Sequence, residues 1–337
     1  MLNTLRSTVL FFDASINERL KLVFNKKGLT MSYFNVPSAM KCYRGGGNVT
    51  EHLKSQTGSN QNTSEIIEIA YDLQAGSYTE FANKNPVFCN SYAEQIATVI
   101  SEHLEDGDTL LDVGSGEMTT LALVLGKLNH TPSEVYAFDI SWSRIAKGRE
   151  FLSMVSDESP FNLVSFVANM EFIPLASKSV DVLTSNHALE PNGGNLEVLL
   201  KELFRVAKKT LVLFEPCYEM NTDVGKARMD DLGYIKGMQD TIEKLGGKLL
   251  LSRRMELVAN PLNPTACFVI EPPSCDGLSI EDTTSRSNIF TMPGSDMPLA
   301  QSGSFLFSHE SGLVFPILNG IPVIKKEQAI LATAFMP

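Results

Sequence analysis

Residues 110–117 read Leu-Leu-Asp-Val-Gly-Ser-Gly-Glu, a short apolar run that ends in a Gly-x-Gly turn. A turn-like Gly107-Asp-Thr109 precedes this stretch, and an apolar run at helical spacing follows it from Met118. This order is typical of the first strand, turn and helix of a doubly wound sheet. The glycines allow a tight turn and let a ligand approach the backbone closely. An ordinary turn without a ligand can use the same residues, so the stretch alone leaves both interpretations open.

The acid before the glycines distinguishes two kinds of nucleotide-binding turn. A dinucleotide fingerprint needs a third glycine at position 119, where this chain has Thr119. The Asp-x-Gly-x-Gly order instead resembles motif I of class I S-adenosylmethionine-dependent methyltransferases. That family's further glycine is replaced here by Met118. The resemblance implies that four residues of the turn bind the cofactor: Asp112, Gly114, Ser115 and Gly116.

Composition narrows the class of protein. The 337 residues are 43% hydrophobic and 20% charged, which is typical of a soluble globular protein of two or three domains. The net charge of −11 argues against a nucleic-acid surface, which needs clustered Lys and Arg. The five cysteines form no Cys-x-x-Cys pair, so we expect neither a disulfide framework nor a zinc site. No signal peptide or membrane-length apolar run is recognisable, and a cytoplasmic protein without membrane contact is expected.

Strand-like and helix-like runs alternate from residue 108 to 272, which predicts a parallel sheet with crossover helices. The predicted strands are Thr109–Val113, Glu134–Asp139, Asn162–Ala168, Val180–Thr184, Thr210–Phe214, Lys248–Met255 and Cys267–Ile270. The predicted helices between them are Thr119–Leu128, Ser141–Met154, Leu196–Ala207 and Asp230–Leu245. Seven strands with a closely spaced final pair match the class I methyltransferase order, in which the last strand returns antiparallel. The expected fold is therefore α/β, a doubly wound, seven-stranded Rossmann-like methyltransferase sheet.

Two smaller regions flank this sheet. We expect residues 1–62 to be a β-rich extension and linker, residues 63–272 the methyltransferase domain, and residues 273–337 a linker and small α+β domain. The extension contains a predicted hairpin of Leu20–Phe24 and Leu29–Phe34, and it could serve as a lid or as a contact in a homodimer. The polar stretch 54–64 is predicted to be a loop. Helices are predicted over Glu65–Phe81, after a cap at Ser64, and over Asn90–Leu104.

A second resemblance lies near the C-terminus. Residues 315–323 read Phe-Pro-Ile-Leu-Asn-Gly-Ile-Pro-Val, similar to the small zinc-ribbon-like activator subunit of tRNA and protein methyltransferases. Asn319-Gly320 is a tight-turn dipeptide that predicts a hairpin. Its expected buried strand residues are Ile317, Ile321 and Val323. The cysteine pairs of metal-binding relatives are missing, so no zinc is expected. The resemblance implies that this domain covers an apolar flank of the sheet.

Ligands of open α/β sheets bind beyond the carboxyl ends of the strands. Asp139 ends the second predicted strand, where an acid can accept hydrogen bonds from a ribose diol, although it could also only cap the next helix. By resemblance, Asn169 lies near the adenine amino group. The remaining cofactor-binding candidates at these strand ends are Ile140, Met170 and Asn186.

The reaction implied is attack by a nucleophilic oxygen or nitrogen on the sulfonium methyl group of S-adenosylmethionine. His187 is the candidate general base, because its pKa lies near neutrality, and packing is its alternative role. Glu190 is a weaker candidate, and Tyr78 is placed near the cofactor by resemblance only. The expected acceptor is a small metabolite or a peptide. The alternatives are an RNA or protein methyltransferase with a built-in activator domain, a non-catalytic cofactor-binding protein, and an NAD-type oxidoreductase.

Overall fold

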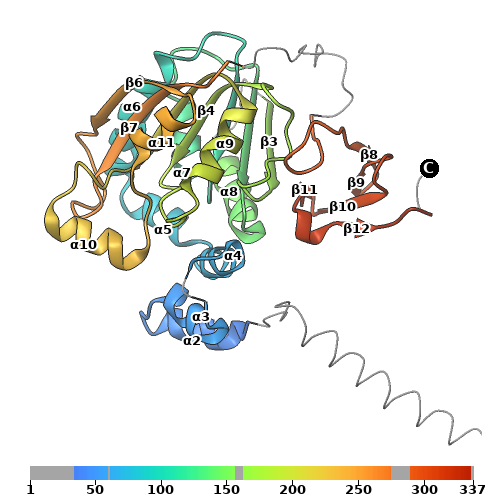
Figure 1. The fold of residues 1–337 in the computed structure, drawn as a ribbon, viewed down its shortest axis with the longest axis horizontal. Helices are drawn as coiled ribbons and strands as arrows, with labels where there is room; N and C mark the ends of the chain where they lie inside the picture. The colour runs from blue at the N-terminus through green and yellow to red at the C-terminus, as the bar shows by residue number, and fades with distance from the viewer. Residues whose placement is uncertain (1–33, 60, 156–161, 275–288, 335–337) are drawn as a thin grey trace, which may run out of the picture. The chain divides into compact units, whose positions relative to one another are not determined.

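The computed structural model describes residues 34–59, 61–155, 162–274 and 289–334 (Figure 1). Packing divides the chain into two compact units, residues 1–59 and 60–337. The second unit contains both a seven-stranded sheet and a smaller antiparallel sheet. Residues near 272, where the sequence predicts a domain boundary, thus lie within one packed unit.

The seven-stranded sheet has the order β3-β2-β1-β4-β5-β7-β6. Its strands are β1 Thr109–Val113, β2 Glu134–Asp139, β3 Asn162–Val167, β4 Val180–Asn186, β5 Ala207–Pro216, β6 Lys248–Arg254 and β7 Thr265–Glu271. The first five strands run parallel, whereas β7 lies between β5 and β6 and is antiparallel to both. The predicted fold class and the antiparallel return of the last strand are confirmed. Strand order reverses between β1 and β4, where open α/β sheets bind their ligands.

Both faces of the sheet are buried, because adjacent residues of each central strand point to opposite sides. On one face, Leu110 and Val182 pack with α6 (Pro86–Ser101) and α7 (Thr119–Leu125). On the other face, Leu111 and its neighbours pack with α9 (Leu196–Val206) and α11 (Met238–Lys244). This double burial explains why the strands read as continuous apolar runs.

Two predicted helices are interrupted by glycines. The segment 65–81 forms α4 (Ser64–Asp72) and α5 (Ser77–Lys84), separated at Gly76, which has φ = 100°. Thr63, rather than the predicted Ser64, caps α4 by accepting a hydrogen bond from the amide of Ile66. The segment 230–245 forms the end of α10 (Asp223–Leu232) and α11, with left-handed glycines at 233 and 237 between them. Glycine supplies these backbone conformations without steric cost: Gly233 ends α10, whereas Gly76 and Gly237 precede the first residues of α5 and α11. Helix α8 spans Trp142–Val155.

Of the first unit, the structure describes residues 34–59, and the strands predicted for the β-rich extension lie almost entirely outside this range. Its described residues form α2 (Val36–Arg44) and α3 (Val49–Thr57), capped by the side chains of Asn35 and Asn48. Residues 54–57 of the predicted loop belong to α3. The predicted hairpin over 20–34 lies almost entirely outside the described residues.

The C-terminal residues form the small antiparallel sheet. Its strands are β8 Ala300–Ser302, β9 Phe305–Phe307, β10 Leu313–Leu318, β11 Ile321–Pro322 and β12 Ile330–Leu331. Asn319 and Gly320 both have positive φ, as the predicted tight turn requires. Ile321 and Val323 are buried, whereas Ile317 is only partly buried.

This small sheet packs directly on the large one. Val323 forms a parallel bridge with Val167 of β3, and the amide of Ile324 donates to the Val167 carbonyl at 2.8 Å. Phe290 and Phe315 belong to the same apolar core as α9 and α11. The buried ammonium of Lys325 is hydrogen-bonded to Glu68 of α4. The C-terminal residues therefore contribute to the core of the large sheet.

The shared core predicts that damage in the small sheet destabilises the large one. Phe315 is fully buried, so Phe315→Ala should lower the free energy of unfolding by about 3–5 kcal/mol. Leu331, 69% exposed, gives a matched control that should change by at most about 0.5 kcal/mol. The measurement is urea unfolding followed by fluorescence of the single tryptophan, Trp142 in α8. An unchanged Trp142 transition in Phe315→Ala would show that the small sheet unfolds independently.

Candidate functional site

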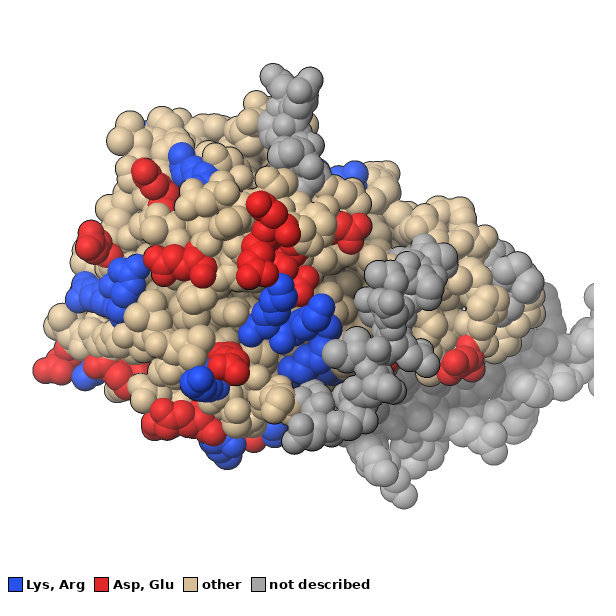
Figure 2. Space-filling view, turned by 90° about the horizontal axis from the view of Figure 1, so that it is seen from above, with Lys and Arg blue, Asp and Glu red and all other residues tan. Residues whose placement is uncertain are grey.

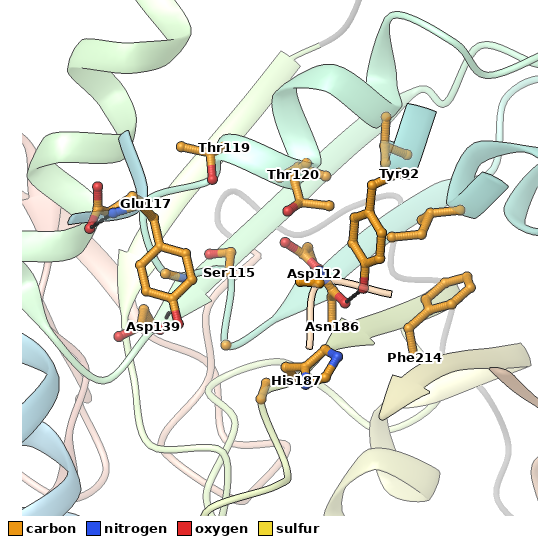
Figure 3. A pocket seen from close by; sticks show the side chains of 18 of the residues that line it. Tyr92, Asp112, Ser115, Glu117, Thr119, Thr120, Asp139, Asn186, His187 and Phe214 are labelled. Atoms are coloured by element: carbon orange, nitrogen blue, oxygen red, sulfur yellow. Dashed lines mark hydrogen bonds between the residues drawn. The ribbon is translucent and has the colours of Figure 1, made fainter. Parts of the chain in front are cut away.

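A cavity of about 320 Å³ opens at the carboxyl ends of β1 and β4, at the point where strand order reverses. Figure 3 shows that the loops after β1, β2 and β4 meet there below α6 and α7. The volume is at the lower end of the range for small-molecule sites. Of the predicted site residues, those that line the cavity are Tyr78, Asp112, Gly114, Ser115, Gly116, Asp139, Ile140, Asn186, His187 and Glu190.

The glycine loop approaches the loop after β4 very closely. A Cβ added to Gly114 would lie 2.4 Å from the Cβ of Ala188, so only glycine fits at this position. Gly116 has φ = 55° and donates its amide to Asp139 at 3.0 Å. Met118, which replaces the family's further glycine, keeps a left-handed φ of 51°. Its fully buried side chain packs with α6 and α7, which offsets the backbone cost of about 1–2 kcal/mol.

Asp139 ties the second strand to the glycine loop. One carboxylate oxygen accepts from the Gly116 amide, and the other accepts from the Ser141 amide at 2.9 Å. Burial raises the pKa of Asp139, although the guanidinium of Arg144 and these amides oppose the rise. A carboxylate has about four acceptor positions, so capacity remains for a hydroxyl group of a ligand. The cap role and the ligand role are therefore compatible.

Asp112 faces the cavity without a hydrogen-bond donor among the described residues. Burial, and then the charges of Asp139 and Glu215, raise the pKa of Asp112 to about 8. A cationic group beside Asp112 would favour its charged form, because an opposite charge compensates for lost hydration. The site is thus suited to a ligand that carries an ammonium or sulfonium group.

Two acids cap the first turns of α5 and α8, and each acid belongs to a different segment of the chain from the helix that it caps. Glu117 accepts from the amides of Gly76, Tyr78 and Thr79, and from the Thr79 hydroxyl at 2.6 Å, at the start of α5. In the opposite direction, Asp72 at the end of α4 accepts from the Ser141 hydroxyl at 2.6 Å and from the amide and hydroxyl of Ser143 at the start of α8. Carboxylates are favourable at both helix starts because of the helix dipole.

Arg144 lies between two tyrosines at one side of the cavity. Its guanidinium carbon is 4.7 Å from the ring centre of Tyr71 and 4.6 Å from that of Tyr78, which are cation–π distances. The Arg144 Nε also donates to the Tyr71 carbonyl at 3.0 Å. Tyr78 therefore contacts Arg144 with its ring face, while its side chain stays about half exposed.

The loop after β4 is held by a buried acid at the end of β5. The Glu215 carboxylate accepts from the Ser185 hydroxyl at 2.8 Å and from the amides of Ala188 and Leu189. Burial raises the pKa of Glu215 to about 7, against the nearby charge of His187. These bonds stabilise a sharp turn in which His187 has a left-handed φ of 56°. Such strained backbone is common at functional sites.

Both ring nitrogens of His187 are hydrogen-bonded. Nδ1 lies 2.7 Å from Glu190 Oε2, and Nε2 lies 2.7 Å from Thr265 Oγ1 of β7. Glu190 also accepts from Asn263 at 3.0 Å. Burial alone would lower the pKa of His187. The hydrogen bond to Glu190 and the charges of Glu190 and Glu215 outweigh burial and raise this pKa above its usual value. His187, which itself lines the cavity, is thus a proton acceptor held between Glu190 and Thr265.

Two predicted residues lie outside the lining of this cavity. The Asn169 amide accepts from the Glu171 backbone at 3.0 Å and donates to the Ser64 hydroxyl at 3.2 Å, while Met170 packs beside Gly114. Residues that sequence reasoning missed are Glu117, Tyr92, Arg144, Asp72 and Thr265. Of these, only Glu117 lay within a recognised motif, directly after Gly116.

The raised pKa of Asp112 predicts a pH-dependent stability. An unfolded aspartate ionises near pH 4, so between about pH 4 and 8 the folded protein holds a proton that the unfolded chain has released. The stabilisation is complete below pH 4 and is lost as the pH rises to 8, by up to about 1.4 kcal/mol per pH unit. Asp112→Asn should remove this dependence, as measured by urea unfolding at pH 5 and pH 8. Equal pH dependence in both proteins would contradict the raised pKa.

The cap formed by Glu117 predicts a local effect on α5. Glu117→Ala should leave the first amides of α5 without an acceptor and lower the local opening free energy by about 1–2 kcal/mol. Hydrogen exchange of the α5 peptide, followed by mass spectrometry, measures this change. Glu80→Ala on the same helix is the control, because the exposed Glu80 pairs only with Lys84. Equal protection in both variants would rule out the capping role.

Residues 111–214 match the family model described as a methyltransferase domain. This span runs from β1 into β5 and contains the loops after β1, β2 and β4. No curated protein matches the chain.

Several solved structures are similar in part. One is a complex between the Haloferax volcanii Trm112 methyltransferase activator and a putative methyltransferase: 13% identity, TM-score 0.46, covering 60% of this chain and 98% of that chain. Another is a putative methyltransferase from Bacillus halodurans C-125, at 16% identity and TM-score 0.42. The match covers 53% of this chain and 98% of that chain. A third is the magnesium protoporphyrin IX methyltransferase of Synechocystis PCC 6803 with bound S-adenosylhomocysteine, at 11% identity and TM-score 0.43, covering 56% and 84%.

No helix among the described residues combines the length and apolar character needed to cross a membrane. Acidic and basic side chains are interspersed on the face shown in Figure 2.

Proposed function

We propose that this protein is an S-adenosylmethionine-dependent methyltransferase that acts on an oxygen or nitrogen atom of a small molecule. The observation that carries the proposal is the cavity at the reversal of strand order, where two buried acids and a glycine loop meet. The methyltransferase-domain match to residues 111–214 supports the same reaction class.

The residues of the cavity fit this cofactor chemically. Asp139 keeps acceptor positions for the ribose hydroxyls, and the unpartnered carboxyl group of Asp112 suits a cationic amino or sulfonium group. Gly114 and Gly116 leave the backbone open to close approach. The cofactor would supply an electrophilic methyl group, and the protein's own part is alignment and exclusion of water.

The acceptor is proposed to be small. The cavity is also lined by apolar side chains, including Phe88, Ile96, Leu121 and Phe214. A polymeric RNA acceptor would require a basic surface, and the net charge of −11 argues against such a surface. We therefore prefer a small-molecule acceptor to RNA or protein. A catalytically inactive cofactor-binding protein would use the same cofactor contacts and is separated from an enzyme only by turnover.

The C-terminal sheet is proposed to act as a built-in stabilising domain of the enzyme. Its Phe290, Phe315 and Ile324 join the apolar core beside β3, and Lys325 pairs with α4, whose Tyr71 borders the cavity. This arrangement supports the resemblance between residues 315–323 and the activator subunit. The absence of cysteine pairs at this motif supports a domain that needs no zinc.

The cofactor assignment predicts saturable binding of S-adenosylhomocysteine, measured by calorimetric titration of the full chain. Asp139→Ala should weaken binding by at least about tenfold, since it removes the ribose acceptor. Glu150→Ala, at an exposed position of α8, is the control and should bind normally.

The competing dinucleotide assignment is tested with the same titration. NADH should give no saturable heat. Binding of NADH, or failure of the folded wild-type protein to bind S-adenosylhomocysteine, would refute the methyltransferase proposal.

A further inference from the structure

The cavity extends from the strand ends along helix α6. The sheet contributes Asp112, Asn186 and Phe214, from the adjacent strands β1, β4 and β5. Four of the α6 residues that line the cavity are spaced four apart: Phe88, Tyr92, Ile96 and Ile100. Residues at this spacing share one side of a helix, and these span about 18 Å at 1.5 Å per residue. The cavity is therefore elongated, with its long direction along α6.

The two ends of this row differ in exposure. At the start of α6, Phe88 contacts the ring of Phe81, which is half exposed, at a centroid distance of 6.1 Å. At the other end, Ile96 and Ile100 are buried in the same apolar core as Val124 of α7. All five residues line the cavity. The cavity thus opens near Phe81 and ends in the core between α6 and α7.

The section between Tyr92 and the buried end suits a hydrocarbon chain. The Tyr92 hydroxyl donates to Asn186 Oδ1 at 2.9 Å, which places Tyr92 at the carboxyl end of β4. Ile100 lies eight residues further along α6, or about 12 Å. An extended chain of roughly ten carbon atoms covers this distance. Ile96, Ile100 and Val124 offer no hydrogen-bond partner, so a polar group buried there would lose free energy.

The cofactor-binding residues lie on the other side of Asp112. Figure 3 shows Glu117 and Asp139 on one side of Asp112, and Tyr92 and Phe214 on the other. The strand order agrees, because β2 carries Asp139 and β5 carries Phe214, with β1 and β4 between them. Strands are spaced by about 4.8 Å, so these two strand ends are separated by about 14 Å. The Tyr92 side of the cavity is therefore available to an acceptor.

The charges at the strand ends select the polar group of that acceptor. Asp112 has no hydrogen-bond donor among the described residues, and Glu190 lines the cavity beside His187. These acids would repel a carboxylate or a phosphate. A hydroxyl or amino group could instead donate a hydrogen bond to a carboxylate.

We propose that the acceptor is an alcohol or amine with an extended hydrocarbon chain. The chain lies along α6 between Tyr92 and Ile100, and the hydroxyl or amino group stays at the ends of β1 and β4. Ile100 and Val124 close the buried end and so limit the length of the chain. This inference rests on the proposed function and names the class of its acceptor.

The test is calorimetric titration of the full chain with 1-hexanol, 1-octanol and 1-decanol, with and without saturating S-adenosylhomocysteine. Affinity should rise about fourfold for each added methylene, because each one leaves water for an apolar wall. Decanoate has the same chain length as 1-decanol but carries a negative charge. It should bind at least about tenfold more weakly.

Two variants change the buried end in opposite directions. Val124→Phe should weaken binding of 1-decanol by about tenfold or more, since at least two methylenes no longer fit, and leave 1-hexanol within about twofold. Ile100→Ala should enlarge the end and favour 1-dodecanol over 1-decanol. Val99→Ala is the matched control, because Val99 is a fully buried residue of α6 in the same core and is not among the lining residues. It should keep the wild-type order of affinities.

The outcomes separate this proposal from the proposed function. If S-adenosylhomocysteine binds but the alcohols do not, or bind without dependence on chain length, the hydrocarbon-chain acceptor is overturned. It is also overturned if Val124→Phe weakens 1-hexanol and 1-decanol equally, or if Ile100→Ala behaves like Val99→Ala. Failure of S-adenosylhomocysteine itself to bind refutes the proposed function, whatever the alcohols do.

Discussion

The close approach of two loops at the carboxyl ends of β1 and β4 determines the geometry of the site. Gly114 and Ala188 meet at a distance that leaves no room for a side chain at 114. The approach is maintained from below by Glu215, which accepts the amides of Ala188 and Leu189. In this tight turn His187 takes a left-handed backbone, and its ring lines the cavity while Nε2 contacts Thr265 of β7.

The same approach brings carboxyl groups together in a buried place. The charges of Asp139 and Glu215 both raise the pKa of Asp112, while burial raises the pKa of all three acids. Without a cation, the repulsion between these carboxylates is reduced when they retain protons. A positively charged ligand would relieve it instead, so the fold stores an electrostatic preference for cations at the point where its loops converge.

The large sheet could be predicted from sequence because its evidence is local. Strands β1 and β2 match their predicted ranges, and the other strands differ only at their ends. The predicted helix bounds were wrong where a glycine has a left-handed backbone, at Gly76, Gly233 and Gly237. Helical periodicity alone does not reveal whether a glycine interrupts or continues a helix. The contacts of Tyr92 with Asn186 and of His187 with Thr265 join residues far apart in sequence, and no local pattern could reveal them.

The packing of residues 289–334 on β3 also has a consequence for assembly. A stabilising partner on the same polypeptide is always present at a high effective concentration, so dilution cannot remove it. The segment 289–334 also covers the carboxyl end of the edge strand β3, where the Ile324 amide donates a hydrogen bond to the Val167 carbonyl. An open sheet edge is a template for pairing with another chain. The attached segment therefore withdraws that carbonyl from pairing with a second copy of the chain.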